Sequence, residues 1–153
     1  MQGGPVGPVT KESTVDWKLE VVIVPVSDVE RAKTFYTDTL GFTLDTDHSS
    51  GDAFRVVQVT PPGSACSLVF GKGLGDSGAP GSLKGCQLVV SDIQAAHAHL
   101  EANGVVNSGP QHFENGAMTP GPDPAGADYN SFIFFDDPDG NTWAVQQVGK
   151  SER

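Results

Sequence analysis

Basic residues are scarce in this sequence. Nine Lys and Arg stand against nineteen Asp and Glu, which gives a formal net charge of −10 at pH 7. The phosphates of nucleic acids bind basic faces, so this balance argues against a nucleic-acid partner. It favours a neutral or cationic small molecule over an anionic one. The alternative, that the charge serves solubility alone, stays open.

Long apolar runs and cysteines are also lacking. No stretch of about 18 apolar residues occurs, so we expect no membrane-spanning segment. The two cysteines, Cys66 and Cys86, have neither the spacing of a metal site nor that of a disulfide framework. Both lie in apolar runs, which favours buried free thiols, with a bridge between them as the alternative.

The first sixteen residues lack a basic region followed by an apolar stretch, which is the pattern of a secretory signal peptide. The Gly- and Pro-rich composition of residues 1–16 instead predicts a disordered leader. Residues 17–150 have the length of one domain with its own core. Together with the free thiols, these features indicate a cytoplasmic protein.

The chain contains an internal duplication. The segments Glu20–Phe42 and Gly85–Val105 each consist of a β-branched run, a helical apolar stripe and a terminal glycine. The run ends in Val-Ser-Asp in both, at Val26–Asp28 and at Val90–Asp92, 64 residues apart. This offset is too long for a solenoid repeat and fits a duplicated half-domain.

The serine of each Val-Ser-Asp step is predicted to cap the helix that follows. Ser27 and Ser91 are followed three residues later by Glu30 and Gln94, as a capping box requires. The glycine that closes each segment is expected to end its helix at the C′ position.

Further strands are expected after each helix. The apolar and alternating runs predict them near residues 42–45, 54–60 and 66–70, and again near 105–108, 131–135 and 142–148.

Each half is therefore predicted to be β-α-β-β-β within an α+β fold. The modules span about residues 17–71 and 84–148, and a linker joins them at 72–83. The stretch 111–130 is expected to interrupt the second module irregularly.

This order of motifs resembles the vicinal oxygen chelate superfamily, which comprises glyoxalase I, bleomycin-resistance proteins and extradiol dioxygenases. The residues that carry the resemblance are PVSDVERAKTFYTDTLGF in the first half, and VVSDI and FDDPDGNTW in the second. The resemblance covers about Trp17 to Val148. It implies two βαβββ modules that form a cup-shaped, mostly antiparallel sheet, and it implies a homodimer.

Enzymes of this superfamily hold a divalent metal in the cup, commonly through His or Glu. The resemblance places those ligands at Val21, Gly85 and Ala144, with a further one at Ser67 or Leu68. Val, Gly and Ala side chains have no lone pair to offer, and Ser and Leu do not suit a divalent metal. We therefore expect neither a cofactor nor metal ligands of the usual kind.

Neighbouring polar residues leave one alternative open, an atypical divalent metal. Glu20 and Gln147 lie near vacated ligand positions, but strand alternation predicts that they face away from the cup unless a bulge reverses them. Gln87 and Gln146 have the cup-facing parity, and we expect them to hydrogen-bond a ligand.

Arg55 and Gln58 lie on opposite faces of the predicted strand 54–60. If the face with Arg55 lines the cup, Arg55 is the fixed cation of the cup and could pair with a carboxylate or enolate. If the face with Gln58 lines the cup, Phe54 and Val56 accompany Gln58, and the three side chains form an aromatic wall with an amide. Both residues are therefore candidate ligand contacts.

The candidates for catalysis lie in two predicted loops that could fold over the mouth of the pocket. His112 with Glu114, or His48 with Asp52, could serve as an acid–base pair. The alternative for each is an ordinary solvated loop residue.

Aromatic residues gather in the second half. Phe132, Phe134 and Trp143 can either pack in the core or stack on a planar ligand. Tyr129 ends the Pro- and Gly-rich stretch 121–130, which sits where a lid would, and is a candidate ligand contact.

Two classes of function remain. The first is a small-molecule binder similar to bleomycin-resistance proteins, which would sequester a drug or natural product of cationic or aromatic character. The missing metal ligands and the acidic charge favour it. The alternative is a lyase, isomerase or cyclase on the same scaffold, which would work without a metal or with an atypical one.

Overall fold

The structure is a computed structural model that describes residues 14–149. All but the last three residues of the predicted leader, 1–16, lie outside this range. Within it, the duplication appears as two sheets, each with its own helix.

The first half forms a four-stranded mixed sheet in the order β1-β4-β3-β2. β1 (Val21–Ile23) runs parallel to β4 (Ser67–Lys72). β3 (Phe54–Thr60) pairs antiparallel with β4 and with β2 (Thr43–Ser50). The β-branched and aromatic side chains of β3 and β4 suit this half-buried, pleated surface.

The second half forms a five-stranded sheet in the order β5-β9-β8-β6-β7. β5 (Cys86–Val90) runs parallel to β9 (Thr142–Gln147), as β1 does to β4. β8 (Phe132–Asp136) lies antiparallel to β9 and, through one residue pair, to β6 (Gln111–Glu114). β7 (Ala117–Pro120) completes the sheet antiparallel to β6. The predicted α+β fold with two related modules is confirmed.

The hairpin β6–β7 was not expected, because residues 111–130 were predicted to be irregular. Its turn is Asn115-Gly116, with φ of 53° and 79°. Positive φ at both central residues is the geometry of a type I′ hairpin, for which Asn-Gly is the preferred pair. Conversely, the strand predicted at 105–108 is reduced to a single bridge between Asn107 and Phe135.

The helices follow each Val-Ser-Asp step, as predicted. α1 (Val29–Lys33) continues into the π-helical η1 (Thr34–Thr39), and α2 spans Ile93–Ala102. Gly41 and Gly104 follow the C-caps with φ of 86° and 71°, so the C′ glycines are confirmed. None of the helices between residues 14 and 149 is long and apolar enough to cross a membrane.

The predicted serine caps are wrong by one residue. The carboxylate of Asp28 accepts a hydrogen bond from the amide of Arg31, and that of Asp92 accepts from Gln94. Asp28 and Asp92 are therefore the N-caps. In the first half the Ser27 hydroxyl is engaged elsewhere, since it donates to Asp139 at 2.6 Å.

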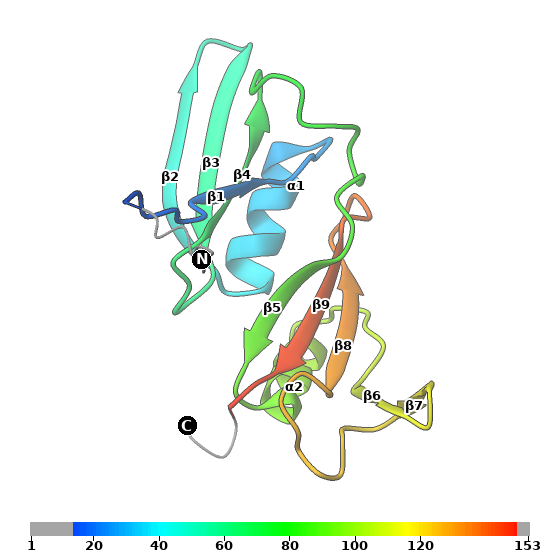
Figure 1. Cartoon of the computed structure of the whole chain (residues 1–153). Coiled ribbons are helices and arrows are strands. Elements are labelled where there is room, and N and C mark those ends of the chain that lie inside the picture. The colour runs from blue at the N-terminus through cyan, green and yellow to red at the C-terminus, as the bar shows by residue number, and fades with distance from the viewer. Residues whose placement is uncertain (1–13, 150–153) are drawn as a thin grey trace.

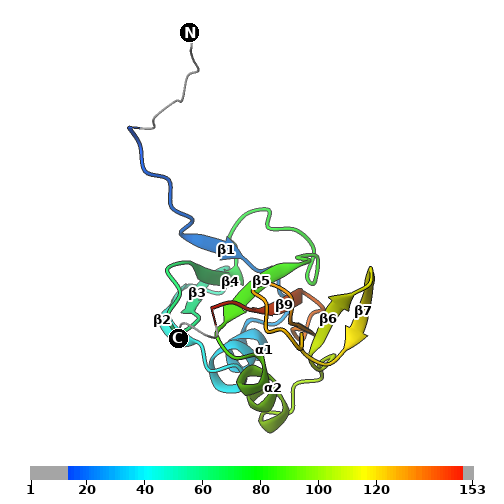
Figure 2. The same cartoon turned by 60° about the horizontal axis from the view of Figure 1, so that its bottom comes forward.

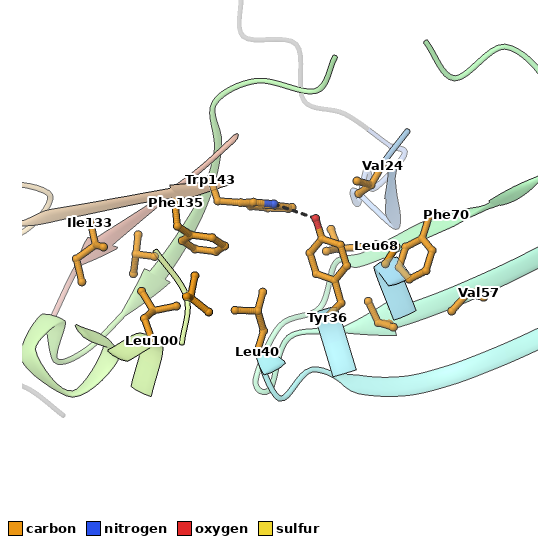
Figure 3. Packing of buried hydrophobic residues seen from close by; sticks show 14 of the residues in the cluster. Val24, Tyr36, Leu40, Val57, Leu68, Phe70, Leu100, Ile133, Phe135 and Trp143 are labelled. Atoms are coloured by element: carbon orange, nitrogen blue, oxygen red, sulfur yellow. Dashed lines mark hydrogen bonds between the residues drawn. The ribbon is translucent and has the colours of Figure 1, made fainter. Parts of the chain in front are cut away.

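Both helices pack on the same side of the two sheets (Figures 1 and 2). We call this side of each sheet the helix face and the opposite side the open face. One hydrophobic core runs beneath both sheets on the helix face, from Val57 and Phe70 in the first half to Ile133 and Leu100 in the second (Figure 3).

Tyr36 of η1 lies at the centre of this core and joins the two halves. Its hydroxyl donates to Asp137 at 2.7 Å and accepts from the indole Nε1 of Trp143 at 3.1 Å. Burial, followed by the Asp137 charge, raises the pKa of the Tyr36 hydroxyl far above its usual value, so the hydroxyl keeps its proton.

The Asp137 carboxylate is 5% exposed and fully used as an acceptor. Besides Tyr36, it accepts from the amides of Asp139 and Asn141 and from the Asn141 side chain. The side chain of Asn141 in turn donates to the carbonyl of Pro25, which lies two residues after β1. The turn between β8 and β9, which carries the DPDGN motif, thus fastens the second module to the first.

The linker and the first helix are held by the same turn. Arg31 forms an ion pair with Asp139 at 3.2 Å, and in the linker the amide of Leu83 donates to the side-chain oxygen of Asn141 at 3.0 Å. A Cβ atom at Gly81 would lie 2.1 Å from the carbonyl oxygen of Asp139, so only glycine fits there.

We expect Tyr36→Phe to lower the free energy of unfolding by about 1–3 kcal/mol, because it leaves a buried indole N–H and a buried carboxylate each short of one hydrogen bond. Urea unfolding followed by tryptophan fluorescence measures this change. Tyr129→Phe is the matched control, because Tyr129 is 58% exposed. Equal stability of the two variants would contradict the role given to the Tyr36 hydroxyl.

Candidate functional site

Strand alternation assigns each side chain to the helix face or to the open face. In β3, Val57 and Val59 are fully buried in the core. Phe54, Val56 and Gln58 therefore lie on the open face, which is the second of the two arrangements weighed for this strand.

Arg55, a predicted ligand contact, lies on the helix face instead. Its guanidinium forms ion pairs with Asp47 at 2.7 Å and with Glu30 of α1 at 2.6 Å. The hydrogen bonds from Arg55 and then from Lys33 hold the pKa of the Asp47 carboxyl well below its usual range. Arg55 thus ties the first helix to its sheet, and its position does not support a contact on the open face.

A polar group occupies the open face of the first sheet. Asp45, at a bulge between β2 and β3, accepts hydrogen bonds from Thr60 and, at 3.5 Å, from Gln58. The hydroxyl of Thr60 also lies 2.6 Å from that of Ser67 on β4. An exposed carboxylate backed by two hydroxyls and an amide can accept from a ligand or attract a cation.

The open face of the second sheet is aromatic. Phe132 and Phe134 are stacked, with ring centroids 6.0 Å apart and planes at 6°. Phe113 of β6 meets Phe132 edge-on at 6.3 Å and 88°. We call these three residues the aromatic panel. Phe113 and Phe134 are 53% and 38% exposed, so their rings have room for a partner.

Phe113 was missed by sequence reasoning, because its strand was expected to be irregular. The Asn115-Gly116 pair is the signal that could have placed it. Phe113 and Gln111 are two residues apart on β6, so their side chains lie on the same face of the strand. Because Gln111 pairs with Phe132, that face is the open face.

The predicted glutamine contacts lie on the open face. Gln87 is exposed on β5, beside a cavity of about 400 Å³ at the Pro61–Ser64 turn between β3 and β4. Gln146 is largely covered, and its amide donates to the carbonyl of Tyr129 at 3.4 Å. Tyr129 itself is exposed, with φ of 65°, at the end of the loop that precedes β8.

Trp143, also a predicted ligand contact, lies on the helix face. It is 3% exposed and packs against Tyr36, to which it donates its hydrogen bond (Figure 3). The core alternative weighed for this residue matches its position, and a ligand on the open face would not reach it.

The candidate catalytic residues are only partly brought together. His112 and Glu114 are in contact, with Nε2 and Oε1 2.8 Å apart. His48 lies on β2, with its ring 6.4 Å from that of Phe54. β2 and β6 stand at opposite ends of the molecule in both views, so His48 and His112 cannot share a site within one chain (Figures 1 and 2).

The ligand positions implied by the metal-dependent relatives do face the open side. Val21 pairs with Ser67, and Ala144 pairs with Gln87, so these four positions lie on the open faces of the two sheets. Their side chains offer no set of donors for a divalent metal. No group of three or more His, Cys, Asp or Glu that could hold a metal ion occurs within residues 14–149. The residues present therefore do not fit the metal centre of the metal-dependent relatives.

Solved structures with the same fold share both sequence and architecture with this chain. The antibiotic-binding protein TnmS3 from Streptomyces sp. CB03234 is 34% identical, with a TM-score of 0.69, over 90% of this chain and 99% of its own. A glyoxalase/bleomycin resistance protein from the same organism is 35% identical, with a TM-score of 0.65, over 85% of this chain and 100% of its own.

A relative from Bacillus subtilis also matches this chain over nearly its whole length. The protein YetH of Bacillus subtilis (strain 168) is 25% identical over 130 residues, which are 85% of this chain and 98% of YetH. The family model described as Glyoxalase/Bleomycin resistance protein/Dioxygenase superfamily matches residues 18–145. The resemblance drawn from the motifs is thereby confirmed, and the chain belongs to the Glyoxalase/Bleomycin resistance protein/Dioxygenase superfamily.

Proposed function

We propose that this protein binds a planar aromatic small molecule of natural-product type, and that binding rather than chemistry is its task. The observation that carries the proposal is the aromatic panel on the open face of the second sheet. Two stacked rings with a third edge-on are the arrangement onto which another flat ring adds favourably.

The reverse side of the same strand supports this interpretation. Ile133 and Phe135, which alternate with the panel along β8, are buried in the core. The core therefore does not need Phe132 or Phe134. Single exposed apolar residues are ordinary, whereas a contiguous cluster of exposed aromatic side chains indicates a binding site.

The charge of the open faces favours a cationic or neutral ligand. The nine strands within residues 14–149 contain one arginine, Arg55, and one lysine, Lys72. These two residues are cross-strand partners on β3 and β4, and both lie on the helix face. The open faces carry carboxylates instead, at Asp45 and Asp136. A net charge of −10 adds to the same field.

Relatives support the same class of ligand. TnmS3, with 34% identity, is described as an antibiotic-binding protein. We extend that class of ligand, a natural product, to this chain. In this proposal the ligand is held without a metal, because residues 14–149 hold no group of three or more His, Cys, Asp or Glu that could bind one.

The enzymatic alternative has less support from the geometry. A general base needs a free lone pair within reach of a substrate proton. Both ring nitrogens of His112 already face oxygen atoms, of Gly121 and Glu114. The pair is thus arranged to hold structure together rather than to move a proton.

We further propose that a second copy of this chain completes the binding site. Large apolar side chains are exposed along the segment before β1 and on the open faces: Trp17, Leu19, Ile23, Val89 and Phe113. Trp17, at 85% exposed, is the most extreme of these. A twofold contact between copies would cover such a surface and enclose the aromatic panel. We place this dimer in the cytoplasm, where Cys66 and Cys86, both free, stay reduced.

We expect the protein to bind proflavine, a flat tricyclic cation, and Phe134→Ala to weaken that binding about tenfold or more. The loss follows from removing a stacking surface that contributes about 0.5–1.5 kcal/mol beyond its buried area. Isothermal titration calorimetry measures the affinity. Leu44→Ala is the control, because Leu44 is an exposed apolar residue (42%) on the helix face of β2. Equal affinities of the two variants would contradict a site on the panel.

We expect the protein to prefer proflavine over anthraquinone-2-sulfonate, a flat tricyclic anion. Asp136→Asn, two residues from Phe134 on the same face of β8, should reduce this preference by up to about fivefold, because an exposed ion pair contributes about 0.2–1 kcal/mol. The ratio of the two affinities by calorimetry gives the result. Asp52→Asn, in the turn between β2 and β3, is the matched control. An unchanged affinity ratio in Asp136→Asn would show that this carboxylate does not act on the bound ligand.

We expect sedimentation to show a dimer at micromolar concentration, and Val89→Asp to shift it toward monomer. A charge on an apolar interface leaves a desolvated carboxylate without a partner. Leu44→Asp is the matched control, because Leu44 is 42% exposed on the helix face of β2, away from the open face. A monomeric wild-type protein would refute the shared site.

A further inference from the structure

Both nitrogens of the buried His112 ring face oxygen acceptors. Nδ1 lies 2.7 Å from the carbonyl oxygen of Gly121, and Nε2 lies 2.8 Å from Oε1 of Glu114. A carbonyl and an ionised carboxylate can only accept, so the ring satisfies both when it carries two N–H groups. A neutral ring would turn one lone pair toward an oxygen.

The charged groups around the ring are acidic. Glu114 lies on the same strand, and Asp123 acts on the ring from the loop after β7. Across the hairpin, the position paired with His112 is the neutral Thr119. The hydrogen bond to Glu114, followed by that to Gly121, raises the pKa of His112 above its ordinary value of 6.5.

The ring connects the hairpin β6–β7 with the loop that follows it. Gly121 begins this loop, and Asp123 within it accepts hydrogen bonds from the amides of Ala125 and Ala127 and from the Asn130 side chain. Asn130 pairs with both the amide and the carbonyl of Phe113.

These contacts form one chain, from His112 through the loop 121–130 to the backbone of Phe113. Because β6 joins β8 by a single residue pair, this chain supplies much of what fixes the hairpin. The position of Phe113 in the aromatic panel therefore depends on it.

We propose that His112 is a positioning residue, whose imidazolium form clamps the β6–β7 hairpin and holds Phe113 in the aromatic panel. The inference rests on the proposed function and deepens it, because it makes ligand affinity depend on pH. The clamp is complete below about pH 6.5 and is lost as the pH rises through the raised pKa of the folded protein.

The protonation state can be tested without any ligand. We expect ¹⁵N NMR of the ring to show both nitrogens of His112 protonated at pH 7, with the transition at a higher pH than that of an ordinary histidine. A neutral tautomer of His112 at pH 7 would overturn the clamp.

The effect on binding is tested with proflavine between about pH 6 and 8.5. Wild-type affinity should fall about fivefold across this range, the contribution of about one hydrogen bond. Glu114→Gln should flatten this profile, because the amide of Gln can donate to Nε2 while the neutral ring still donates to Gly121. His97→Gln, at a half-buried histidine beside Glu101 on α2, should keep the wild-type profile.

A Glu114→Gln profile as steep as that of the wild type would overturn the proposal. Absence of proflavine binding at every pH would count against the proposed function, and the ring NMR would then decide the clamp by itself. The two proposals can thus fail separately.

Discussion

The buried carboxylate of Asp137 is the contact on which the rest of the structure depends. Its charge is balanced by hydrogen-bond donors from both halves: Tyr36 of the first module and the turn residues Asp139 and Asn141 of the second. An unpaired charge in a core is costly, whereas one with every acceptor site used is stable and geometrically demanding. These hydrogen bonds join the first module to the turn between β8 and β9 and so hold the two modules together.

The motifs that identify the family are the motifs that make this joint. Tyr36 belongs to the FY motif, and Asp137, Asn141 and Trp143 belong to FDDPDGNTW. All four contribute to the core or its hydrogen bonds and leave the open face untouched. This separation explains why family membership specifies the scaffold here, while the residues at the metal-ligand positions are free to be Val21 and Ala144.

Much of the scaffold could be predicted from the sequence because its signals are local. A few neighbouring residues are enough to predict the Val-Ser-Asp steps and the C′ glycines. The same holds for the strand faces on which Gln87 and Gln146 lie. Arg55 and Trp143 could not be placed, because alternation says which residues share a face but not which face is covered. The contact between Tyr36 and Asp137 joins residues 101 positions apart, so no local pattern shows it.

The aromatic panel is the feature that the scaffold alone does not explain. Two faces of β8 carry aromatic residues, but only Phe135 is needed by the core. Stability would be served as well by polar side chains at positions 132 and 134, and solubility would be served better. Since Phe113 reaches the same place from a separate hairpin, held by its own polar network, the three rings are gathered rather than scattered. A surface that collects three aromatic rings from two elements, with the carboxylate of Asp136 further along the same face of β8, is built for a flat, positively charged or neutral partner.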